Sequence, residues 1–274
     1  MLNVSVASGR KILRKFFSDK ERLVVLTGAG ISSGSGIPTY RSLAGNWQAG
    51  TPIKHQDFLA KRSSRKRYWM RSYAGWPTIN RAKPSPAHYG LKQLEEAEKL
   101  SLVVTQNVDR LHQLAGSRIV LDLHGRIDQV ICLGCPRIYQ RSYIQRLLKS
   151  ENPFLKESGQ TNPDGDAHID SYRSLDIKTP ICESCQSDLK PNVTFFGDSV
   201  NRDLVNTVYQ KINESDGFVA IGTSLKVFSG YRFLRHAAEK RIPIAVINAG
   251  SSRGQNLSNL YLRYKADDLL ENLI

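Results

Sequence analysis

Short apolar runs separated by helical patterns recur along the chain and predict alternating strands and helices. Each of the four clearest runs is followed by small or polar residues, as when parallel strands present a ligand at their carboxyl ends. The clearest helical patterns cover residues 87–99, opened by Ser85 as N-cap and by Pro86, and residues 230–241. This alternation indicates a doubly wound, Rossmann-like α/β sheet. The predicted strands are residues 23–26, 102–104, 218–221 and 244–247.

Two segments interrupt this alternation. Residues 49–81 are helix-like, basic and aromatic, and residues 126–190 contain both C-x-x-C pairs around a polar, turn-rich middle. We therefore predict a Rossmann-like domain that carries a helical excursion at 49–81 and a smaller, cysteine-bearing lobe at 126–190. The Rossmann-like domain is assigned residues 1–48, 82–125 and 191–274.

The composition is ordinary for a globular protein, but the net charge is high. Of 274 residues, 40% are hydrophobic, and no apolar run approaches the ~20 residues that cross a bilayer. The charge of +14 fits nucleic acid, an acidic ligand or simply a basic surface. We interpret the amphipathic N-terminal pattern as the domain's first helix, although a mitochondrial import helix has a similar pattern. We expect a cytoplasmic protein, with the mitochondrial matrix as the alternative.

The four cysteines form two C-x-x-C pairs, "CLGC" and "CESC", and none is left over. Four thiolates are the number that a closed tetrahedral zinc site needs, and no open position then remains for a substrate. We therefore predict a structural zinc ion, with two redox-active dithiols as the alternative. The predicted ligands are Cys132, Cys135, Cys182 and Cys185.

The segment "LTGAGISSGSGIPTYR" at 26–41 starts like a dinucleotide-binding loop and then departs from that pattern. Gly28 and Gly30 allow a tight turn and a close approach to a pyrophosphate. The third glycine comes late, and the acidic ribose ligand expected about 20 residues on is missing. Pro38 is expected to end the helix and to send Tyr40 and Arg41 across the mouth of the site. The loop indicates a nucleotide site unlike that of an ordinary dehydrogenase.

A polar cluster follows the second predicted strand. Gln106, Asn107 and Asp109 lie in "TQNVDRLH", and the composition of this segment fits a polar turn as well as a ligand site. An amide and a carboxylate together suit a carboxamide ligand, because one can donate and the other accept hydrogen bonds.

Among the histidines, His124 is the strongest candidate for catalysis. It follows an apolar stretch and precedes a glycine, and an ordinary histidine pKa near ~6.5 suits a general base. His88 and His112 are interpreted as packing residues on helices, and His168 lies in the cysteine-bearing insertion.

A series of motifs resembles the sirtuin family closely, over nearly the whole chain from about residue 23. The "YWMRSYAGWP", "PDGD" and "FFGD" segments look most like the class II branch, which includes mitochondrial lysine deacylases. The motifs, in the family's order, are "GAGISSGSGIPTYR", "TQNVDRLHQLAG", "LHGR", the two C-x-x-C pairs, "LKPNVTFFGD", "GTSL" and "INAG".

The resemblance implies an acyl-lysine groove between a Rossmann domain and a zinc lobe, with NAD consumed as a substrate. It implies that His124 is the catalytic base and that Asn107 and Asp109 act on the nicotinamide side. The residues implied to bind NAD are Gly28, Ala29, Gly30, Ile31, Ser32, Pro38, Tyr40, Arg41, Gln106, Asn107, Val108, Asp109, Gly222, Thr223, Ser224, Asn248, Ala249, Gly250 and Ala266. The residues implied to contact the acyl-lysine substrate are Val193, Phe195, Phe196 and Gly197.

The implied reaction is acyl transfer from lysine to ADP-ribose, with release of nicotinamide and O-acyl-ADP-ribose. The implied partners are acyl-lysine proteins, and we expect a monomer that uses neither a membrane nor, as its main ligand, nucleic acid. The sequence departs from the class II pattern at Thr39, where an acidic residue is usual, so loop closure is expected to differ.

The basic stretch around residues 61–71 contains the spacing Tyr68-x-x-Arg71. Sirtuins that remove negatively charged acyl groups use a Tyr and an Arg at such a spacing to hold the acyl carboxylate. Arg71 would do so through a charge-assisted contact. The alternative is a solvated basic helix face with Trp69 packed inward.

Other functions fit parts of the sequence. Protein mono-ADP-ribosyl transfer would use the same pocket, and the sequence does not separate it from deacylation. A non-catalytic nucleic-acid-binding module fits the charge and the zinc lobe but needs neither His124 nor the polar cluster. A zinc-containing oxidoreductase fits least, because the ribose acid is missing and all four cysteines are used.

Overall fold

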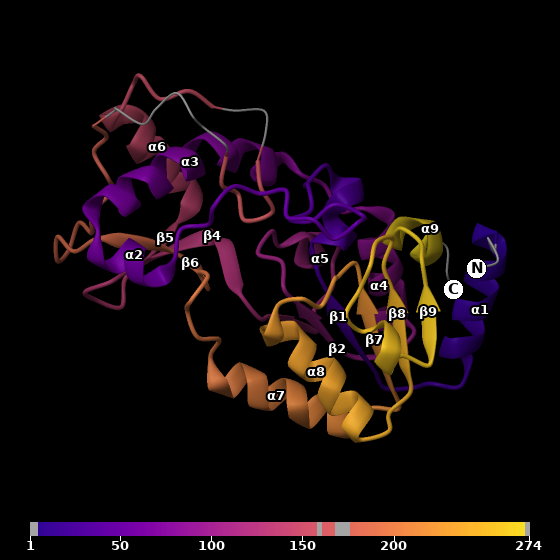
Figure 1. Cartoon of the computed structure of the whole chain (residues 1–274). Helices are drawn as coiled ribbons and strands as arrows, with labels where there is room; N and C mark the ends of the chain where they lie inside the picture. The colour runs from indigo at the N-terminus through magenta and orange to yellow at the C-terminus, as the bar shows by residue number, and fades with distance from the viewer. Residues whose placement is uncertain (1–4, 158–160, 168–175, 272–274) are drawn as a thin grey trace.

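The computed structural model describes residues 5–157, 161–167 and 176–271, which form a larger and a smaller lobe (Figure 1). The larger lobe is built on a sheet that has, among these residues, six parallel strands in the order β3-β2-β1-β7-β8-β9. The chain builds outward from β1 in one direction and then from β7 in the other, which creates a topological switch point between them. The strands are β1 (Leu23–Thr27), β2 (Leu100–Thr105), β3 (Val120–Asp122), β7 (Gly217–Ile221), β8 (Ile244–Ile247) and β9 (Leu260–Leu262).

Helices cover both faces of this sheet, which confirms the doubly wound prediction (Figure 1). Leu23 and Val25 of β1 pack into a hydrophobic cluster with α1, α4 and α9, whereas Val24 and Leu26 pack into another with α7 and α8. Successive side chains of a strand point to opposite faces, so a strand covered on both sides is apolar throughout. These helices are α1 (Val6–Ser18), α4 (Pro86–Glu96), α7 (Arg202–Asn213), α8 (Phe228–Glu239) and α9 (Ala266–Leu270).

The smaller lobe combines an antiparallel sheet, β5-β4-β6, with three helices. A hydrophobic cluster joins the helical residues 49–81 to the cysteine-bearing residues 126–190, and Trp69 is fully buried within it. We therefore group the two predicted segments as one lobe. Its elements are α2 (His55–Ala60), α3 (Arg62–Arg81), β4 (Gly125–Cys132), β5 (Ile138–Gln140), α6 (Arg141–Glu151) and β6 (Leu189–Val193).

The predicted helices are present but end earlier than their patterns. Helix α4 stops at Glu96 and α8 at Glu239, because Glu98 and Arg241 turn into the left-handed region with φ of 57° each. The predicted cap of α4 is confirmed as a capping box that Ser85 forms with His88. The remaining short elements are η1 (Ala29–Ser35), α5 (Leu111–Leu114) and η2 (Gln255–Leu257).

The amphipathic N-terminal segment forms α1, which buries Leu13 and Phe17 against the sheet, as predicted for the domain's own first helix. The first and last described helices, α1 and α9, lie side by side, and Nε of Arg10 donates to the Asp268 carbonyl at 2.7 Å (Figure 1). Within the described part of the chain, none of the helices has the length and apolar composition to cross a membrane.

Candidate active site

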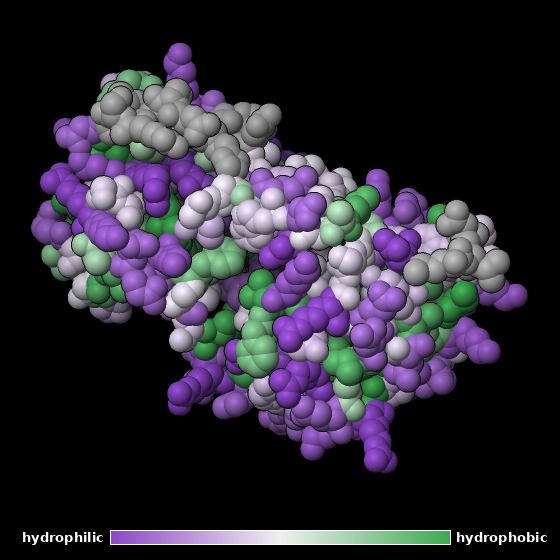
Figure 2. All heavy atoms as spheres, viewed as in Figure 1, coloured by the Kyte–Doolittle hydropathy of each residue, from purple (hydrophilic) through white to green (hydrophobic). Residues whose placement is uncertain are grey.

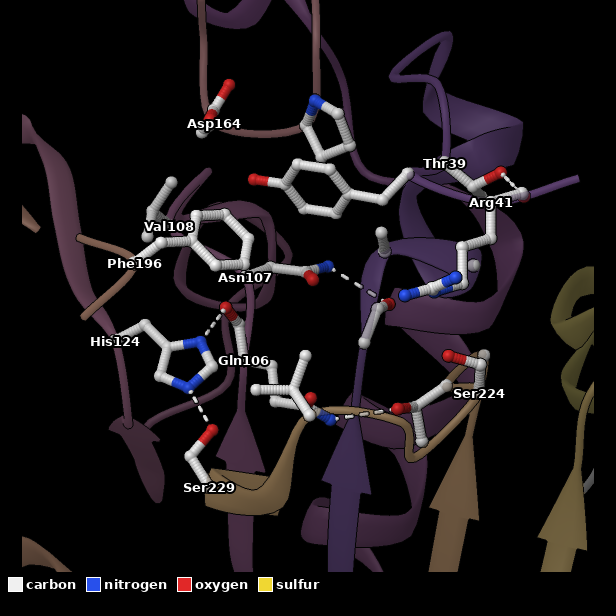
Figure 3. A pocket seen from close by; sticks show the side chains of 18 of the residues that line it. Thr39, Arg41, Gln106, Asn107, Val108, His124, Asp164, Phe196, Ser224 and Ser229 are labelled. Atoms are coloured by element: carbon white, nitrogen blue, oxygen red, sulfur yellow. Dashed lines mark hydrogen bonds between the residues drawn. The ribbon is translucent and has the colours of Figure 1, made fainter. Parts of the chain in front are cut away.

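A cavity of about 890 Å³ opens between the lobes, at the carboxyl ends of β1, β2, β7 and β8. Turns that follow these four strands form its wall on the large lobe. The small lobe contributes α3, the end of β6 with the residues after it, and residues 163–166. Ligands of doubly wound sheets bind at this edge, next to the switch point. The fold thus brings residues distant in sequence to one site (Figure 3).

His124 is held in the pocket wall by both ring nitrogens (Figure 3). Nδ1 lies 2.9 Å from the carbonyl oxygen of Gln106, and Nε2 lies 2.8 Å from Oγ of Ser229. A carbonyl oxygen only accepts, so Nδ1 carries the proton and Nε2 accepts from the Ser229 hydroxyl. Burial lowers the pKa of His124, against the opposing effect of the Gln106 bond. The imidazole is therefore neutral at pH 7, with its lone pair at Nε2.

A chain of hydrogen bonds orients Asn107. Its Nδ2 donates to the carbonyl of Gly28 at 3.2 Å and to Oγ of Ser32 at 3.0 Å. Ser32 in turn donates to Oδ2 of Asp109 at 2.7 Å, and Oδ1 of Asp109 accepts from the backbone of Leu111. Both amide hydrogens of Asn107 are thereby used, which leaves its side-chain oxygen as the acceptor for a ligand in the pocket.

Burial raises the pKa of Asp109, and its hydrogen bonds with Leu111 and Ser32 oppose this rise. The side chain is buried and lies behind the pocket wall, which includes Asn107 but not Asp109 or Ser32. Asp109 and Ser32 therefore position Asn107 from behind the wall in this structure.

The early glycines of the first loop are required by contact with another strand end. A Cβ on Gly30 would lie 2.7 Å from Cα of Gly222, and a Cβ on Gly28 would lie 2.8 Å from Cβ of Thr223. The amide of Gly30 donates to the Gly222 carbonyl at 2.8 Å. Packing between the turns after β1 and β7 thus explains these glycines, in addition to any contact with a phosphate.

The first loop does not end as predicted. Residues 29–35 form the 3-10 helix η1, which stops at Gly36, where φ is 81°. The helix therefore ends two residues before Pro38, because Gly36 adopts the left-handed conformation that closes a helix. The prediction that Pro38 ends the helix is wrong in this detail.

Beyond this end, the loop folds back over the pocket. The Tyr40 ring stacks on Trp47, with ring centroids 5.2 Å apart, and the Arg41 guanidinium lies over the same indole. Nη1 of Arg41 donates to the Gly45 carbonyl at 3.0 Å, and Thr39 donates its hydroxyl to the Arg41 carbonyl at 2.7 Å. Thr39 thus stabilises the turn with a hydrogen bond, where an acidic residue would bring a charge.

The four cysteines come together at one end of the small sheet. Their Sγ atoms all lie within 4.8 Å of one another. Tyr139 donates its hydroxyl to Sγ of Cys182 at 3.2 Å, and the amide of Gly134 lies 3.3 Å from Sγ of Cys132. With metal–sulfur bonds near 2.3 Å, four thiolates at this spacing fit a tetrahedral zinc ion. Such a group can hold zinc. Two independent redox-active dithiols would not need the two C-x-x-C pairs to come together, so their convergence favours the zinc site.

Most predicted site residues line the pocket, and a smaller group does not. The pocket also includes residues that the sequence analysis did not assign to it, because they reach the cavity only once the chain is folded. Those in the wall are Gly28, Ala29, Gly30, Tyr40, Arg41, Tyr68, Gln106, Asn107, Val108, His124, Val193, Phe195, Phe196, Gly197, Gly222, Thr223, Ser224, Asn248, Ala249, Gly250 and Ala266. Those outside it are Ile31, Ser32, Pro38, Arg71 and Asp109, and the unassigned ones include Trp47, Asp164, Asp166, Ser229 and Arg232.

The predicted carboxylate clamp of Tyr68 and Arg71 does not match the structure. Tyr68 lines the pocket, but Nη2 of Arg71 pairs with Oδ2 of Asp166 at 2.9 Å and Nε donates to the Ala167 carbonyl at 3.0 Å. This guanidinium is already engaged by a buried carboxylate that the spacing along α3 gave no reason to expect. Trp69 points into the core, as the alternative interpretation held.

His88 and His112 are buried neighbours with ring centroids 4.8 Å apart, as expected for packing residues. His88 accepts at Nδ1 from the backbone of Ser85, and burial lowers its pKa to about 4. His168 lies outside the described residues.

Comparison with known proteins places this geometry in a family context. Residues 28–229 match the family model described as "Sir2 family". The "NAD-dependent protein deacetylase 2" of Bradyrhizobium diazoefficiens is 42% identical over 263 residues, which cover 96% of each chain. The human "NAD-dependent protein lipoamidase sirtuin-4, mitochondrial" is 42% identical over 264 residues, which cover 95% of this chain and 84% of that protein.

A solved structure described as "Structural Basis for the Mechanism and Regulation of Sir2 Enzymes" superposes with a TM-score of 0.75 at 28% sequence identity. The match covers 97% of this chain and 95% of that one. Both lobes are therefore included in the similarity.

Proposed function

This chain belongs to the Sir2 family, and on that premise we propose that the pocket between its lobes removes acyl groups from protein lysine side chains while consuming NAD. The observation that carries the proposal is the state of His124: a neutral imidazole whose Nε2 lone pair faces the pocket beside Ser229. A pure binding module needs no such base. The similarity to human sirtuin-4 favours the class II branch.

The lining of the pocket fits NAD at the sheet edge. Gly28, Gly30 and Gly222 bring bare backbone to the surface, and Asn107 offers a side-chain oxygen that no donor among the described residues uses. These groups would hold the pyrophosphate and the nicotinamide side, and Ser224 with Asn248 would hold the adenosine half. When bound, NAD supplies the ADP-ribose that accepts the acyl group as nicotinamide leaves.

His124 accepts a proton at Nε2 in this scheme. The Ser229 hydroxyl occupies that nitrogen in the structure and must turn aside when a substrate hydroxyl takes its place. The Gln106 carbonyl keeps accepting from Nδ1–H throughout, so the ring stays oriented and its positive charge is partly compensated. His124 can thus take up a proton at Nε2 while its hydrogen bond to the Gln106 carbonyl stays in place.

The four cysteines would hold one zinc ion in a structural role. With every ligand position taken by sulfur, the ion has no open site for catalysis. Cys132 ends β4 and Cys135 lies in the turn after it, the other two ligands precede β6, and residues 193–197 at the end of β6 line the pocket. A bound ion would fix this substrate-binding strand relative to β4.

The rim of the pocket fits a protein substrate. Exposed hydrophobic side chains stand among the lining residues, while most of the face in Figure 2 is hydrophilic. Such residues can pack against a peptide that presents its acyl-lysine to the cavity. We expect a monomer and a cytoplasmic location, with the mitochondrial matrix as the alternative. The rim residues are Leu43, Trp47, Phe196, Val227 and Phe228.

Mass spectrometry of NAD with acyl-lysine peptides tests the proposal. Wild-type protein should form O-acyl-ADP-ribose, nicotinamide and free lysine, and the His124→Ala variant should form almost none. ADP-ribose attached to protein, without peptide deacylation, would instead support mono-ADP-ribosyl transfer. If both proteins consume NAD equally, the role of His124 as the base is wrong.

A further inference from the structure

One end of the pocket is formed by carboxylates. Asp164 and Asp166 belong to the segment 161–167 and both line the cavity. In Figure 3, Asp164 lies beyond Phe196 and Val108 as seen from His124, at the end opposite Ser229. The strand ends and Ser224, which suit the nucleotide, lie at the bottom and right of the view, away from Asp164 (Figure 3). The carboxylates are therefore placed where the far end of an acyl group would reach.

Close packing on helix α3 holds these carboxylates in position. The amide of Ala167 donates to the Arg71 carbonyl at 3.1 Å, and Nε of Arg71 donates back to the Ala167 carbonyl at 3.0 Å. A Cβ on Gly75 would lie 2.4 Å from the carbonyl oxygen of Gly165, so only glycine permits this approach. The segment is thus part of the pocket's built wall.

One carboxylate oxygen at this end has no donor among the described residues. Oδ2 of Asp166 pairs with Arg71, whereas no described residue donates a hydrogen bond to Oδ1, although Asp166 is only 4% exposed. Asp164 accepts from the Asp166 amide at 3.2 Å and lies close enough to raise the pKa of Asp166, after the larger effect of burial. A buried acceptor without a donor is rare in native proteins and calls for a ligand group. Around these two carboxylates, Arg71 is already paired, Arg67 contributes only a Coulombic attraction to Asp166, and Tyr40 shares a hydrogen bond with Asp164.

Resting on the proposed function, we propose that Asp164 and Asp166 make the enzyme select acyl groups whose far end donates a hydrogen bond, such as a terminal amide, over acyl groups that end in a carboxylate. A donor would satisfy Oδ1 of Asp166, to which no described residue donates. A carboxylate would meet the carboxyl groups of Asp164 and Asp166, and Arg71 is already paired with Asp166, which makes this end of the pocket a repulsive element of specificity. The selectivity is opposite to that expected from Tyr68 and Arg71 in the sequence.

Two nearly isosteric substrates isolate this effect. We would compare a peptide bearing glutaryl-lysine with the same peptide bearing glutaramoyl-lysine, in which a terminal amide replaces the carboxylate, and use valeryl-lysine and acetyl-lysine as references. At pH 8, kcat/KM for the amide should exceed that for the carboxylate by at least about tenfold, because like charges in a desolvated site repel strongly. Peptide Kd values, measured by calorimetry, should show the same order.

Asp164→Asn and Asp166→Asn test the assignment, since each removes a charge with little change of shape. Either variant should lower the amide-to-carboxylate ratio at least fivefold, mainly by improving the glutaryl substrate. Asp166→Asn also frees Arg71 and should have the larger effect, provided it folds. Among the described residues Asp164 forms no ion pair with an arginine, so Asp164→Asn provides the test if Asp166→Asn does not fold. Asp176→Asn, at an exposed carboxylate that pairs with Lys66, is the matched control and should leave the ratio unchanged.

The outcomes separate the inference from the proposed function. If no acyl peptide, acetyl-lysine included, is turned over, the proposed function fails. If acetyl or valeryl peptides are turned over but glutaryl equals or exceeds glutaramoyl in wild type, the specificity inference alone is overturned. A tenfold preference that survives both Asp→Asn substitutions would assign the selectivity to other residues and overturn it as well.

Discussion

In the large lobe, each central strand is buried on both faces between helices, whereas in the small lobe one hydrophobic cluster joins segments that lie far apart in the sequence. The large lobe encloses its core mainly with helices and strands, together with loop residues such as Leu123 and Leu225. The small lobe adds four cysteines at the end of a short antiparallel sheet. We therefore expect its arrangement to depend on a bound ion as well as on hydrophobic burial.

The two lobes also divide the work at the pocket. His124 and Asn107 follow strands of the large lobe, and their orientation is fixed by hydrogen bonds to that lobe. Asp164, Asp166 and Tyr68 come from the small lobe and line the other end. Changes to the two lobes should thus affect reaction and substrate choice separately, with integrity of the small lobe as a condition for both.

Removing zinc should have the largest effect, because it acts on the lobe that depends on it. A strong chelator, or Cys182→Ser, should abolish deacylation and expose the small lobe to proteolysis, while the far-ultraviolet circular dichroism of the large lobe largely persists. Added zinc should restore activity to the chelated protein. Ser184→Ala, in the same "CESC" turn, is the matched control for the substitution and should keep activity. A metal-free protein with full activity would contradict a structural role for the ion.

The fold of the large lobe could be predicted further than that of the small lobe, for a physical reason. A strand buried on both faces is recognisable from its apolar run alone, and the predicted residues 244–247 coincide with β8. Once the strands are located, the polar residues that follow them become candidate site residues, so Asn107 and His124 could be singled out. The short edge strands β3 and β9 carry three residues each and leave no periodic signal.

Other features escaped because they depend on contacts across the chain. The Arg71–Asp166 pair joins residues on α3 to a loop in the cysteine-bearing segment, and no local pattern encodes it. The place of Asp109 behind the wall follows from Ser32, which intervenes between it and Asn107. Ser229 reaches His124 only because α8 begins beside the pocket.

Replacing His124 should have the next largest effect and should leave both lobes folded. His124→Ala is expected to lower kcat for deacylation by about 10²–10⁴-fold, the range for loss of a general base. The thermal unfolding midpoint should change little, because none of the three hydrophobic clusters includes this side chain. His236→Ala, on the surface of α8, is the control and should retain activity. A loss of less than tenfold would contradict the assignment of the base.

Removing the Ser229 hydroxyl should have a smaller effect on the same base. Ser229→Ala removes the hydroxyl that a substrate hydroxyl must displace from Nε2, and a hydrogen bond worth about 0.5–1.5 kcal/mol corresponds to roughly a two- to tenfold higher kcat/KM. A bond donated to the neutral ring opposes protonation, so its loss should also move the acid limb of the pH profile to higher pH. Ser229→Thr keeps the hydroxyl and should restore both values. An unshifted profile in Ser229→Ala would reduce the role of Ser229 to packing.

The pH dependence of the wild type should give the smallest change and the finest test of how the lobes cooperate. The active form of His124 is neutral, so activity falls as pH drops through its pKa, which burial places below the ordinary 6.5. At pH 6.5 more than half of the activity at pH 8 should remain, because less than half of the ring is protonated. An acid-limb midpoint at or above 6.5, with zinc content unchanged, would contradict this. Since the small lobe helps to shield the pocket, loosening that lobe should return the midpoint toward 6.5, whereas an Asp164→Asn substitution, which changes only the far end of the pocket, should leave it in place.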